Sequence, residues 1–285
     1  AARARGWAPR DLAGLKVGLA LGAGTEKGYA HLGVLQVLER AGVPVDFIAG
    51  TSVGSTVAAM YAAGDPPDLI ADRLDHVAQV AFRPVVPVRA LLSSAKVSEG
   101  VKAACRGLRF EDLGIPTAIV AADLASGREV VFRHGLIWPA IMASISIPGI
   151  WPAQRIGGYV LVDGGIVNPV PSRVVCEMGA DVVIAVKLGR HQYPAPVAAT
   201  ATAPGGPVPT MMPTITRTLE IMQSKITTET ASAATILIEP AFKDEPSGGL
   251  RNFRAGRRYM RTGQLAAEMA LPLIADALPW LPRSL

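Results

Sequence analysis

Short apolar runs alternate with stretches of helical periodicity along most of this sequence, and this alternation restricts the possible folds more than any other feature. Residues 16–21 are apolar and lead into a glycine-rich stretch, which predicts a buried strand followed by a turn. Apolar residues spaced three and four apart then predict a helix over residues 28–41. A strand at residues 46–49 and a helix at residues 53–63 follow. Elements in this order predict parallel strands joined by right-handed crossovers.

The same alternation continues to the C-terminus. Further strands are predicted at residues 117–122, 129–132, 159–162, 181–186 and 235–238, and further helices at residues 135–144, 172–178, 215–226 and 260–271. Half of the 285 residues are apolar, which suits a globular chain with a large buried core. We therefore expect an α/β fold, a three-layer sandwich with a mostly parallel central sheet.

No linker-like segment divides the pattern into two parts. We expect one domain over residues 15–285, preceded by an N-terminal extension over residues 1–14. Within the domain, residues 189–213 contain six prolines and almost no periodicity, which is long for an ordinary connection. They follow a predicted strand, and ligands of parallel sheets bind beyond the carboxyl ends of strands. This segment is either a surface loop or a lid over the site.

Charge and cysteine content exclude several classes of function. The net charge of +5 is small and scattered, and no nucleic-acid-binding motif accompanies it, so we expect no nucleic-acid partner. Cys105 and Cys176 belong to no CxxC or Cys/His cluster, so we expect no structural zinc site. No signal peptide and no run of about 18 apolar residues occur, so we expect no segment that spans a bilayer. The two isolated cysteines favour the reducing cytoplasm as the compartment. Because the sequence starts at Ala1, we expect an upstream regulatory domain in a longer protein.

Residues 50–54 carry the sequence feature with the clearest chemistry. They match G-x-S-x-G, with Ser52 at the centre between Gly50 and Gly54. A predicted strand precedes them and a predicted helix follows, which is the context of a nucleophile elbow. The helix N-terminus contributes N–H groups and positive potential, which favour a developing anion. Ser52 is therefore the candidate nucleophile.

A serine nucleophile needs a base, and the sequence offers two. Asp163 ends a predicted strand, and Gly164 and Gly165 after it would allow another backbone to come close. A partly desolvated carboxylate has a raised pKa and can accept the serine proton directly. The alternative is a Ser-Asp-His triad, for which His191 is the only histidine that follows a plausible acid.

Taken together, these residues resemble the patatin-like phospholipases, in particular the bacterial and neuropathy-target-esterase-like branch. The resemblance covers residues 16–188 well and the C-terminal third more loosely, and it extends to residues 143–149 and 168–171. It implies hydrolysis of carboxylic esters of phospholipids or lysophospholipids by a Ser52–Asp163 dyad, without metal or cofactor. It also implies that the glycine-rich segment after the first strand forms the oxyanion hole, here with Ala23, Gly24, Thr25, Lys27 and Gly28.

This glycine-rich segment departs from the family pattern, Gly-Gly-Gly-x-Arg-Gly. Ala23 and Thr25 replace glycines and Lys27 replaces the arginine. Only glycine reaches positive φ at low cost, so an impaired loop in a lipid-binding protein with little turnover is an alternative function. A dinucleotide site is a weaker alternative, because Gly28 comes one position too late for G-x-G-x-x-G.

A group of arginines near the C-terminus predicts contact with membranes. Arg254, Arg257, Arg258 and Arg261 follow the spacing i, i+3, i+4, i+7, which would gather four cations on one helix face, on a different side from the core-facing residues that follow. Such a face could dock reversibly on an anionic bilayer, and residues 278–282 would add an interfacial tryptophan. The alternative is that the arginines pair with distant carboxylates such as Asp244 or Glu245.

Overall fold

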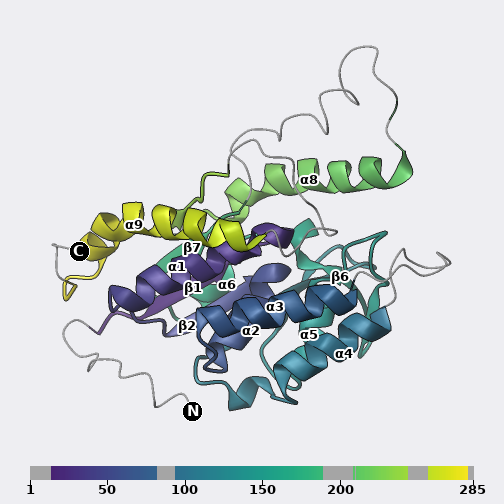
Figure 1. Ribbon diagram of the computed structural model, residues 1–285, viewed down its shortest axis with the longest axis horizontal. Helices are drawn as coiled ribbons and strands as arrows, with labels where there is room; N and C mark the ends of the chain where they lie inside the picture. Colours follow the sequence, from purple (N-terminus) through teal and green to yellow (C-terminus); the bar gives the residue numbers. More distant parts are fainter. Residues whose placement is uncertain (1–13, 82–93, 189–207, 209, 243–255, 282–285) are drawn as a thin grey trace.

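A computed structural model describes residues 14–81, 94–188, 208, 210–242 and 256–281 (Figure 1). The N-terminal extension, apart from Gly14, and most of the proline-rich segment therefore lie outside the described residues, as do His191 and Arg254. Among the helices of the described ranges, none combines the length and the apolar content of a membrane span.

An eight-stranded sheet forms the centre of the fold, in the order β5-β6-β3-β2-β1-β7-β8 with β4 paired to β3. The strands are β1 (Val17–Leu21), β2 (Phe47–Thr51), β3 (Thr117–Asp123), β4 (Glu129–Phe132), β5 (Gln154–Ile156), β6 (Tyr159–Asp163), β7 (Val182–Val186) and β8 (Ile236–Ile238). The pairs β1–β2, β1–β7, β2–β3 and β7–β8 are parallel, as the sequence predicts. The pairs that β3 forms with β4 and β6, and the pair β5–β6, are antiparallel.

Helices cover both faces of this sheet (Figure 1). They are α1 (Tyr29–Arg40), α2 (Val53–Ala62), α3 (Pro67–Ala81), α4 (Ser94–Cys105), α5 (Ile137–Ser144), α6 (Ser172–Glu177), α8 (Met211–Thr230) and α9 (Tyr259–Ala277), with short 3-10 turns η2 (Thr25–Gly28), η3 (Phe110–Asp112) and η4 (Gly164–Ile166). The predicted helices are present, whereas α3, α4 and the short strand β5 were not predicted.

Strand β1 shows why the fold has three layers. Leu19 and Leu21 are fully buried in the cluster that α1, α2 and α9 form on one face, whereas Ala20 packs with α6 on the other. Because successive side chains of a strand point to opposite faces, a strand with apolar residues throughout must be covered on both sides. The expected three-layer sandwich with a mostly parallel sheet is therefore confirmed.

The partners of β3 determine how the two ends of the sheet meet. Ile119 and Val120 pair with both β2 and β4, and Ala121 and Ala122 pair with both β4 and β6. A strand has only two edges, so β4 occupies one edge while β2 and β6 share the other, end to end. The two strands run in opposite directions along β3, and their carboxyl ends therefore face each other.

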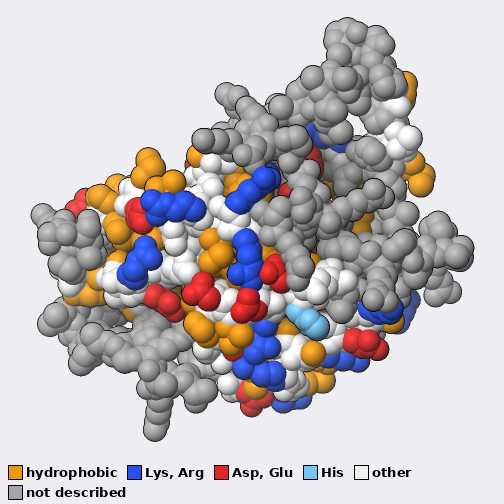
Figure 2. All heavy atoms as spheres, in the orientation of Figure 1, with side chains coloured by type: hydrophobic (Ala, Val, Ile, Leu, Met, Phe, Trp, Pro, Cys, Tyr) orange, Lys and Arg blue, Asp and Glu red, His pale blue; other side chains and the backbone are white. Residues whose placement is uncertain are grey.

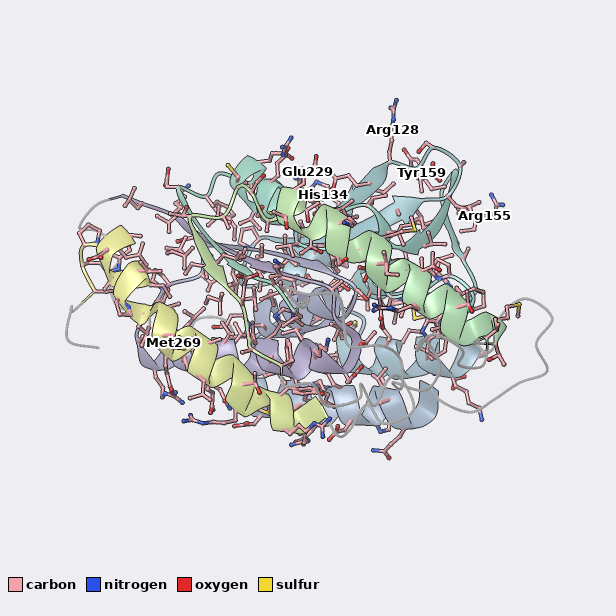
Figure 3. All side chains as sticks on the ribbon, turned by 90° about the horizontal axis from the view of Figure 1, so that it is seen from above. Arg128, His134, Arg155, Tyr159, Glu229 and Met269 are labelled. Atoms are coloured by element: carbon pink, nitrogen blue, oxygen red, sulfur yellow. The ribbon has the colours of Figure 1, made fainter. Side chains whose placement is uncertain are left out.

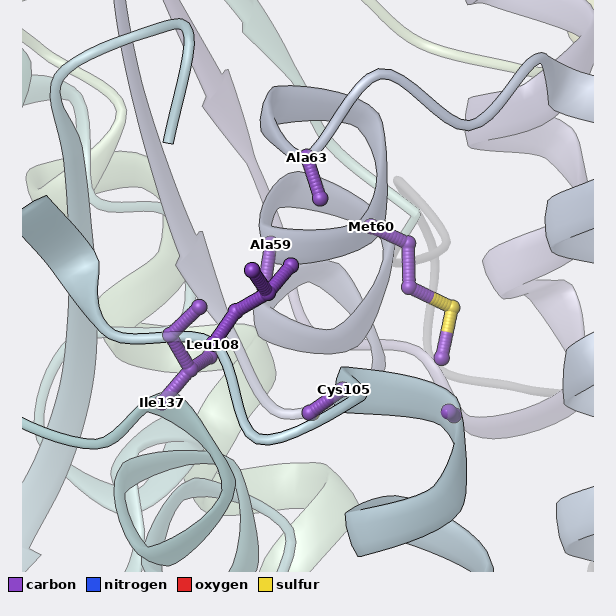
Figure 4. Close-up of a pocket in the computed structure, with 7 residues that line it drawn as sticks. Ala59, Met60, Ala63, Cys105, Leu108 and Ile137 are labelled. Atoms are coloured by element: carbon purple, nitrogen blue, oxygen red, sulfur yellow. The ribbon is translucent and has the colours of Figure 1, made fainter. Parts of the chain in front are cut away.

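A small apolar cavity lies between α2, α4 and α5 (Figure 4). Its lining residues are Ala59, Met60, Ala63, Ala104, Cys105, Leu108 and Ile137. Burial raises the pKa of Cys105 to about 12, which keeps the thiol protonated, and Cys176 is exposed. The lining lacks the convergent polar groups of a ligand site, so the cavity is a packing defect of the core.

The arginine face near α9 is partly neutralised. Arg257 lies 2.7 Å from Asp75 and 2.5 Å from Asp72, both on α3, and Arg261 lies 3.6 Å from Glu268. The face that Figure 2 shows accordingly mixes basic and acidic side chains. Arg257 thus pairs with carboxylates distant in sequence, as the alternative expects, although Asp244 and Glu245 themselves lie outside the described residues. Contact with an anionic membrane stays a prediction, but these ion pairs reduce the unpaired positive charge that would attract anionic lipids.

Helix α9 presents two different faces. Ala267 is fully buried against the core, while Met269 is 82% exposed and projects away from the sheet (Figure 3). After the helix, Leu278 and Leu281 are buried and Trp280 packs partly buried against the same core. Most of the apolar tail that the sequence assigns to a membrane contact is thus used inside the protein.

Helices α1 and α9 approach each other through glycines, which leads to a first prediction. A Cβ at Gly263 would lie 1.9 Å from the carbonyl oxygen of Ala30. We expect Gly263→Ala to lower the free energy of unfolding by about 2 kcal/mol, since the backbones would have to separate. Gly158→Ala is the matched control, because its Cβ would meet nothing within 4 Å. Urea unfolding of both variants measures the difference, and equal stabilities would contradict the close approach.

Candidate active site

Ser52 occupies a strained turn between β2 and α2. Its φ of 55° and ψ of −126° are rare for a residue with a side chain. The turn requires glycines, because a Cβ at Gly54 would lie 2.1 Å from the Leu21 carbonyl oxygen and one at Gly50 would lie 2.3 Å from that of Gly54. The predicted strand–turn–helix context of G-x-S-x-G is present in full.

Asp163 meets Ser52 at this turn. The Ser52 Oγ donates to Asp163 Oδ2 over 2.7 Å, and both side chains are buried. The contact follows from the edge of β3, where β2 ends at Thr51 opposite Val120 and β6 ends at Asp163 opposite Ala121. Two residues far apart in sequence are thereby brought together by adjacent positions of one strand.

The turn after Asp163 holds its carboxylate. The Gly165 N–H donates to Asp163 Oδ1 over 2.7 Å. A Cβ at Gly164 would lie 2.3 Å from the Val120 carbonyl oxygen, so only glycine allows this approach to β3. Both glycines that the sequence analysis singled out therefore have a structural function here.

Burial determines the acid–base properties of this carboxylate. It raises the pKa of Asp163 to about 6, and the hydrogen bonds from Ser52 and Gly165 oppose that rise. At neutral pH the group is then mostly ionised, yet more basic than an ordinary aspartate. It can therefore accept a proton from the hydroxyl that contacts it.

Two serines at the end of α5 support the pair, and sequence reasoning did not identify them individually. Ser144 Oγ accepts a hydrogen bond from the Ser52 N–H over 2.8 Å and donates to the Val120 carbonyl over 2.6 Å. The Asp163 N–H donates to the Ser146 carbonyl over 2.9 Å. The signal was present, because both serines belong to the stretch 143–149 that carried part of the resemblance.

A second set of contacts holds the residue before the nucleophile. Thr51 Oγ1 donates to the carbonyl oxygen of Asn168 over 2.9 Å, and the Asn168 side-chain amide donates to Glu129 over 2.8 Å. In the sequence, the stretch 168–171 carries only part of the family resemblance, and its contact with Thr51 emerges from the structure.

The glycine-rich segment runs beside the elbow, but its five predicted oxyanion residues have different roles. The Ala23 N–H donates to the Pro169 carbonyl and the Lys27 N–H to the Gly24 carbonyl, so neither amide is available to a ligand. Gly28 is a packing position, because its Cβ would lie 2.2 Å from Val53. Within the described ranges, the N–H groups of Gly24 and Thr25 have no hydrogen-bond partner.

Thr25, which replaces a glycine of the family pattern, still adopts the left-handed conformation that glycine reaches at low cost. Its φ is 48°, in the left-handed region, and its hydroxyl donates to Glu26 over 2.6 Å. The segment thus forms its turn with a threonine, at a cost in backbone strain of roughly 1–3 kcal/mol. A substituted glycine does not prevent the loop from forming.

The histidines of the described residues do not contact Ser52. His31 is buried and hydrogen-bonds to the Gly22 carbonyl oxygen, while His76 and His134 are exposed. His191 lies outside the described residues. No group of three or more potential metal-ligating side chains occurs in the part of the chain that the structure describes.

The comparison with known families agrees with this geometry. The sequence profile described as Patatin-like phospholipase matches residues 19–175, which include both Ser52 and Asp163. The chain belongs to the patatin-like phospholipase family. The match begins within β1 and ends within α6, so it spans the elbow, the glycine-rich segment and the Asp163 turn.

Relatives place the chain near the NTE proteins of this family. An uncharacterized NTE family protein of Mycobacterium tuberculosis is 36% identical over 61% of this chain and 49% of its own length. A second one is 31% identical over 94% of this chain and 48% of its own length. The mouse patatin-like phospholipase domain-containing protein 6 is 32% identical over 63% of this chain and 14% of its own. The chain spans about half the length, or less, of these relatives.

Among solved structures, VipD from Legionella pneumophila has a similar fold. It is 14% identical, with a TM-score of 0.51, and the alignment covers 90% of this chain and 66% of VipD. At this identity the likeness concerns the fold alone, and it supports the α/β architecture described above.

The raised pKa of Asp163 predicts a pH-dependent effect of Asp163→Asn on stability. The folded state holds a proton that the unfolded chain releases between pH 3.8 and about 6, so wild-type stability falls as pH rises through this window. Asparagine does not titrate and can keep both contacts, with its Oδ1 accepting from the Gly165 N–H and its Nδ2 donating to the Ser52 Oγ. We expect the stability of the variant relative to wild type to increase from pH 4 to pH 7, by roughly 3 kcal/mol at most.

Asp123, at the end of β3, is the matched control for this prediction. Hydrogen bonds, first of all from the Ser126 side chain, lower its pKa, so its contribution to stability is present above the unfolded pKa and is lost as pH falls. Asp123→Asn should therefore lose stability relative to wild type as pH rises. Thermal unfolding measures the slope of Asp163→Asn from pH 4 to pH 7 and that of Asp123→Asn below about pH 5, where the contribution of Asp123 changes, and slopes of the same sign would contradict the assignment.

Proposed function

We propose that this chain is a serine esterase that hydrolyses carboxylic esters of phospholipids or lysophospholipids, with Ser52 as nucleophile and Asp163 as its base. The observation that carries the proposal is the direct 2.7 Å hydrogen bond from Ser52 Oγ to Asp163 Oδ2 inside a nucleophile elbow. A buried carboxylate in contact with the hydroxyl supplies the base without a histidine. The substrate class comes from the family, whose profile spans both residues.

The proposed reaction has two steps that use the same pair. Asp163 accepts the Ser52 proton while Oγ attacks the ester carbonyl, and the proton then passes to the leaving alcohol. Water, deprotonated by Asp163, hydrolyses the acyl-enzyme and restores the serine. Both steps pass through a tetrahedral oxyanion, which requires hydrogen-bond donors held in advance.

The donors we assign are the N–H groups of Gly24 and Thr25. They lack partners among the described residues, and the backbone just before them packs against the elbow at Gly54. The N-terminus of α2, which starts at Val53, adds positive potential at the same place. Ser52 itself does not contribute an amide, because its N–H is bound to Ser144.

Substitution of the pair tests the proposal. We expect Ser52→Ala and Asp163→Asn each to lower kcat by at least about a thousandfold, and the double variant to be no worse than either one, because the two groups act as a unit. Turnover of a p-nitrophenyl ester and of a lysophospholipid gives the rates, with a fluorophosphonate probe to label Ser52. Near wild-type activity of Asp163→Asn would exclude the dyad.

Two further results separate the alternatives. His191→Ala should keep the wild-type kcat, and a large loss would favour the Ser-Asp-His triad. Absence of both Ser52 labelling by the probe and turnover of any ester would favour the lipid-binding protein with an impaired oxyanion loop.

The pH dependence of turnover follows from the same carboxylate. Asp163 accepts a proton only when ionised, and its pKa is about 6. We expect kcat/KM to rise about tenfold per pH unit below that value and to level above it, as a single ionisation requires. A pH profile of wild type from 4.5 to 8.5 measures this, and a profile without an inflection near pH 6 would contradict the assignment of the base.

A further inference from the structure

His31 lies fully buried on the first turn of α1, against the segment that precedes the two unpartnered amides. Its Nε2 is 2.8 Å from the carbonyl oxygen of Gly22. A carbonyl oxygen only accepts, so Nε2 carries the proton and donates it. Nδ1 is buried and has no hydrogen-bond partner among the described residues. Only Nε2 of this imidazole therefore has a hydrogen-bond partner among the described residues.

The contact restricts a single peptide group. The peptide between Gly22 and Ala23 is bound at both ends, since its oxygen accepts from His31 and its N–H donates to the Pro169 carbonyl over 2.8 Å. The Gly22 N–H donates to Val186 over 3.0 Å. Gly24 and Thr25 follow immediately, so the direction of their N–H groups depends on the orientation of this peptide.

Without His31 the Gly22 carbonyl would lose its only hydrogen bond recorded in the described part of the chain. The carbonyl is also crowded, because a Cβ at Gly54 would lie 2.8 Å from its oxygen. An unpaired buried acceptor is costly, and a rotation of the peptide toward another donor would relieve that cost. Such a rotation would redirect the next two amides.

We propose that His31 is a positioning residue for the oxyanion hole, holding the Gly22–Ala23 peptide so that the Gly24 and Thr25 amides face the reacting carbonyl. The proposal rests on the esterase function proposed above and adds a residue to that site. His31 touches neither the substrate nor Ser52. It acts through one backbone hydrogen bond.

An imidazole suits this position because it donates without a charge. Burial lowers the pKa of His31 to about 4, so the ring is neutral under the conditions of turnover. What the position requires is then a neutral N–H donor at the distance of Nε2. Glutamine carries its amide nitrogen the same number of bonds from Cβ, whereas asparagine is one bond short.

This difference in reach defines the experiment. His31→Gln and His31→Asn introduce the same chemical group, and only glutamine should bond to the Gly22 carbonyl. His31→Phe keeps the ring volume without the donor. Leu35→Val, one turn further along α1 in the same buried core, controls for general loosening of the helix. Steady-state kinetics, the rate of phosphonylation by a fluorophosphonate, and amide hydrogen exchange of residues 22–28 are measured for each folded variant.

We expect His31→Asn and His31→Phe to lower kcat and the phosphonylation rate by about tenfold or more with KM nearly unchanged, since a misplaced donor acts on the transition state. Exchange in residues 22–28 should accelerate in both, and His31→Gln should restore most of the rate and the protection. Leu35→Val should leave kcat near wild type. If His31→Phe fails to fold, the asparagine–glutamine pair still gives the comparison.

Two results would overturn the positioning role. One is a kcat for His31→Asn within twofold of wild type. The other is equal exchange in residues 22–28 for the asparagine and glutamine variants. The exchange measurement needs no turnover, so it tests the contact between His31 and the Gly22 carbonyl independently of the proposed function. The proposed function itself fails if wild type hydrolyses no ester.

Discussion

The shared edge of β3 is the constraint on which the rest of the site depends. β2 and β6 lie end to end along it, one parallel and one antiparallel, and they end opposite Val120 and Ala121. The Ser52 hydroxyl and the Asp163 carboxylate therefore meet because two strands share one edge of β3. Backbone pairing with β3 determines the distance between the two side chains. The geometry of this pair is in this way a property of the sheet rather than of loops.

Close backbone contacts make this arrangement possible and also make it intolerant of change. At Gly54, Gly50 and Gly164, an added Cβ would lie only 2.1–2.3 Å from a backbone carbonyl oxygen. The strained φ of Ser52 is held by the same contacts and by Ser144, which binds the Ser52 N–H and the Val120 carbonyl. The strain is sustained because the surrounding elements leave the turn no other conformation.

Burial also shifts the acid–base properties of the groups in this site. Asp163 is 2% exposed, and the resulting desolvation makes it a better base while two hydrogen bonds keep it ionised near neutral pH. The same burial lowers the pKa of His31 and keeps it a neutral donor. Opposite shifts in an acid and a base thus arise from one cause, and both favour the forms that the proposed reaction uses.

The sequence by itself determined the features that depend on local pattern. The elbow around Ser52, the Asp163 turn and the order of most strands and helices follow from periodicity and glycine placement over a few residues. Tertiary structure alone decided the antiparallel part of the sheet, the contribution of Ser144, and which amides of residues 23–28 stay free. The Ala23 amide is occupied because Pro169 lies beside it, and the Gly22 carbonyl meets His31. Such pairings join segments whose proximity no local pattern encodes, because it arises only when the layers pack.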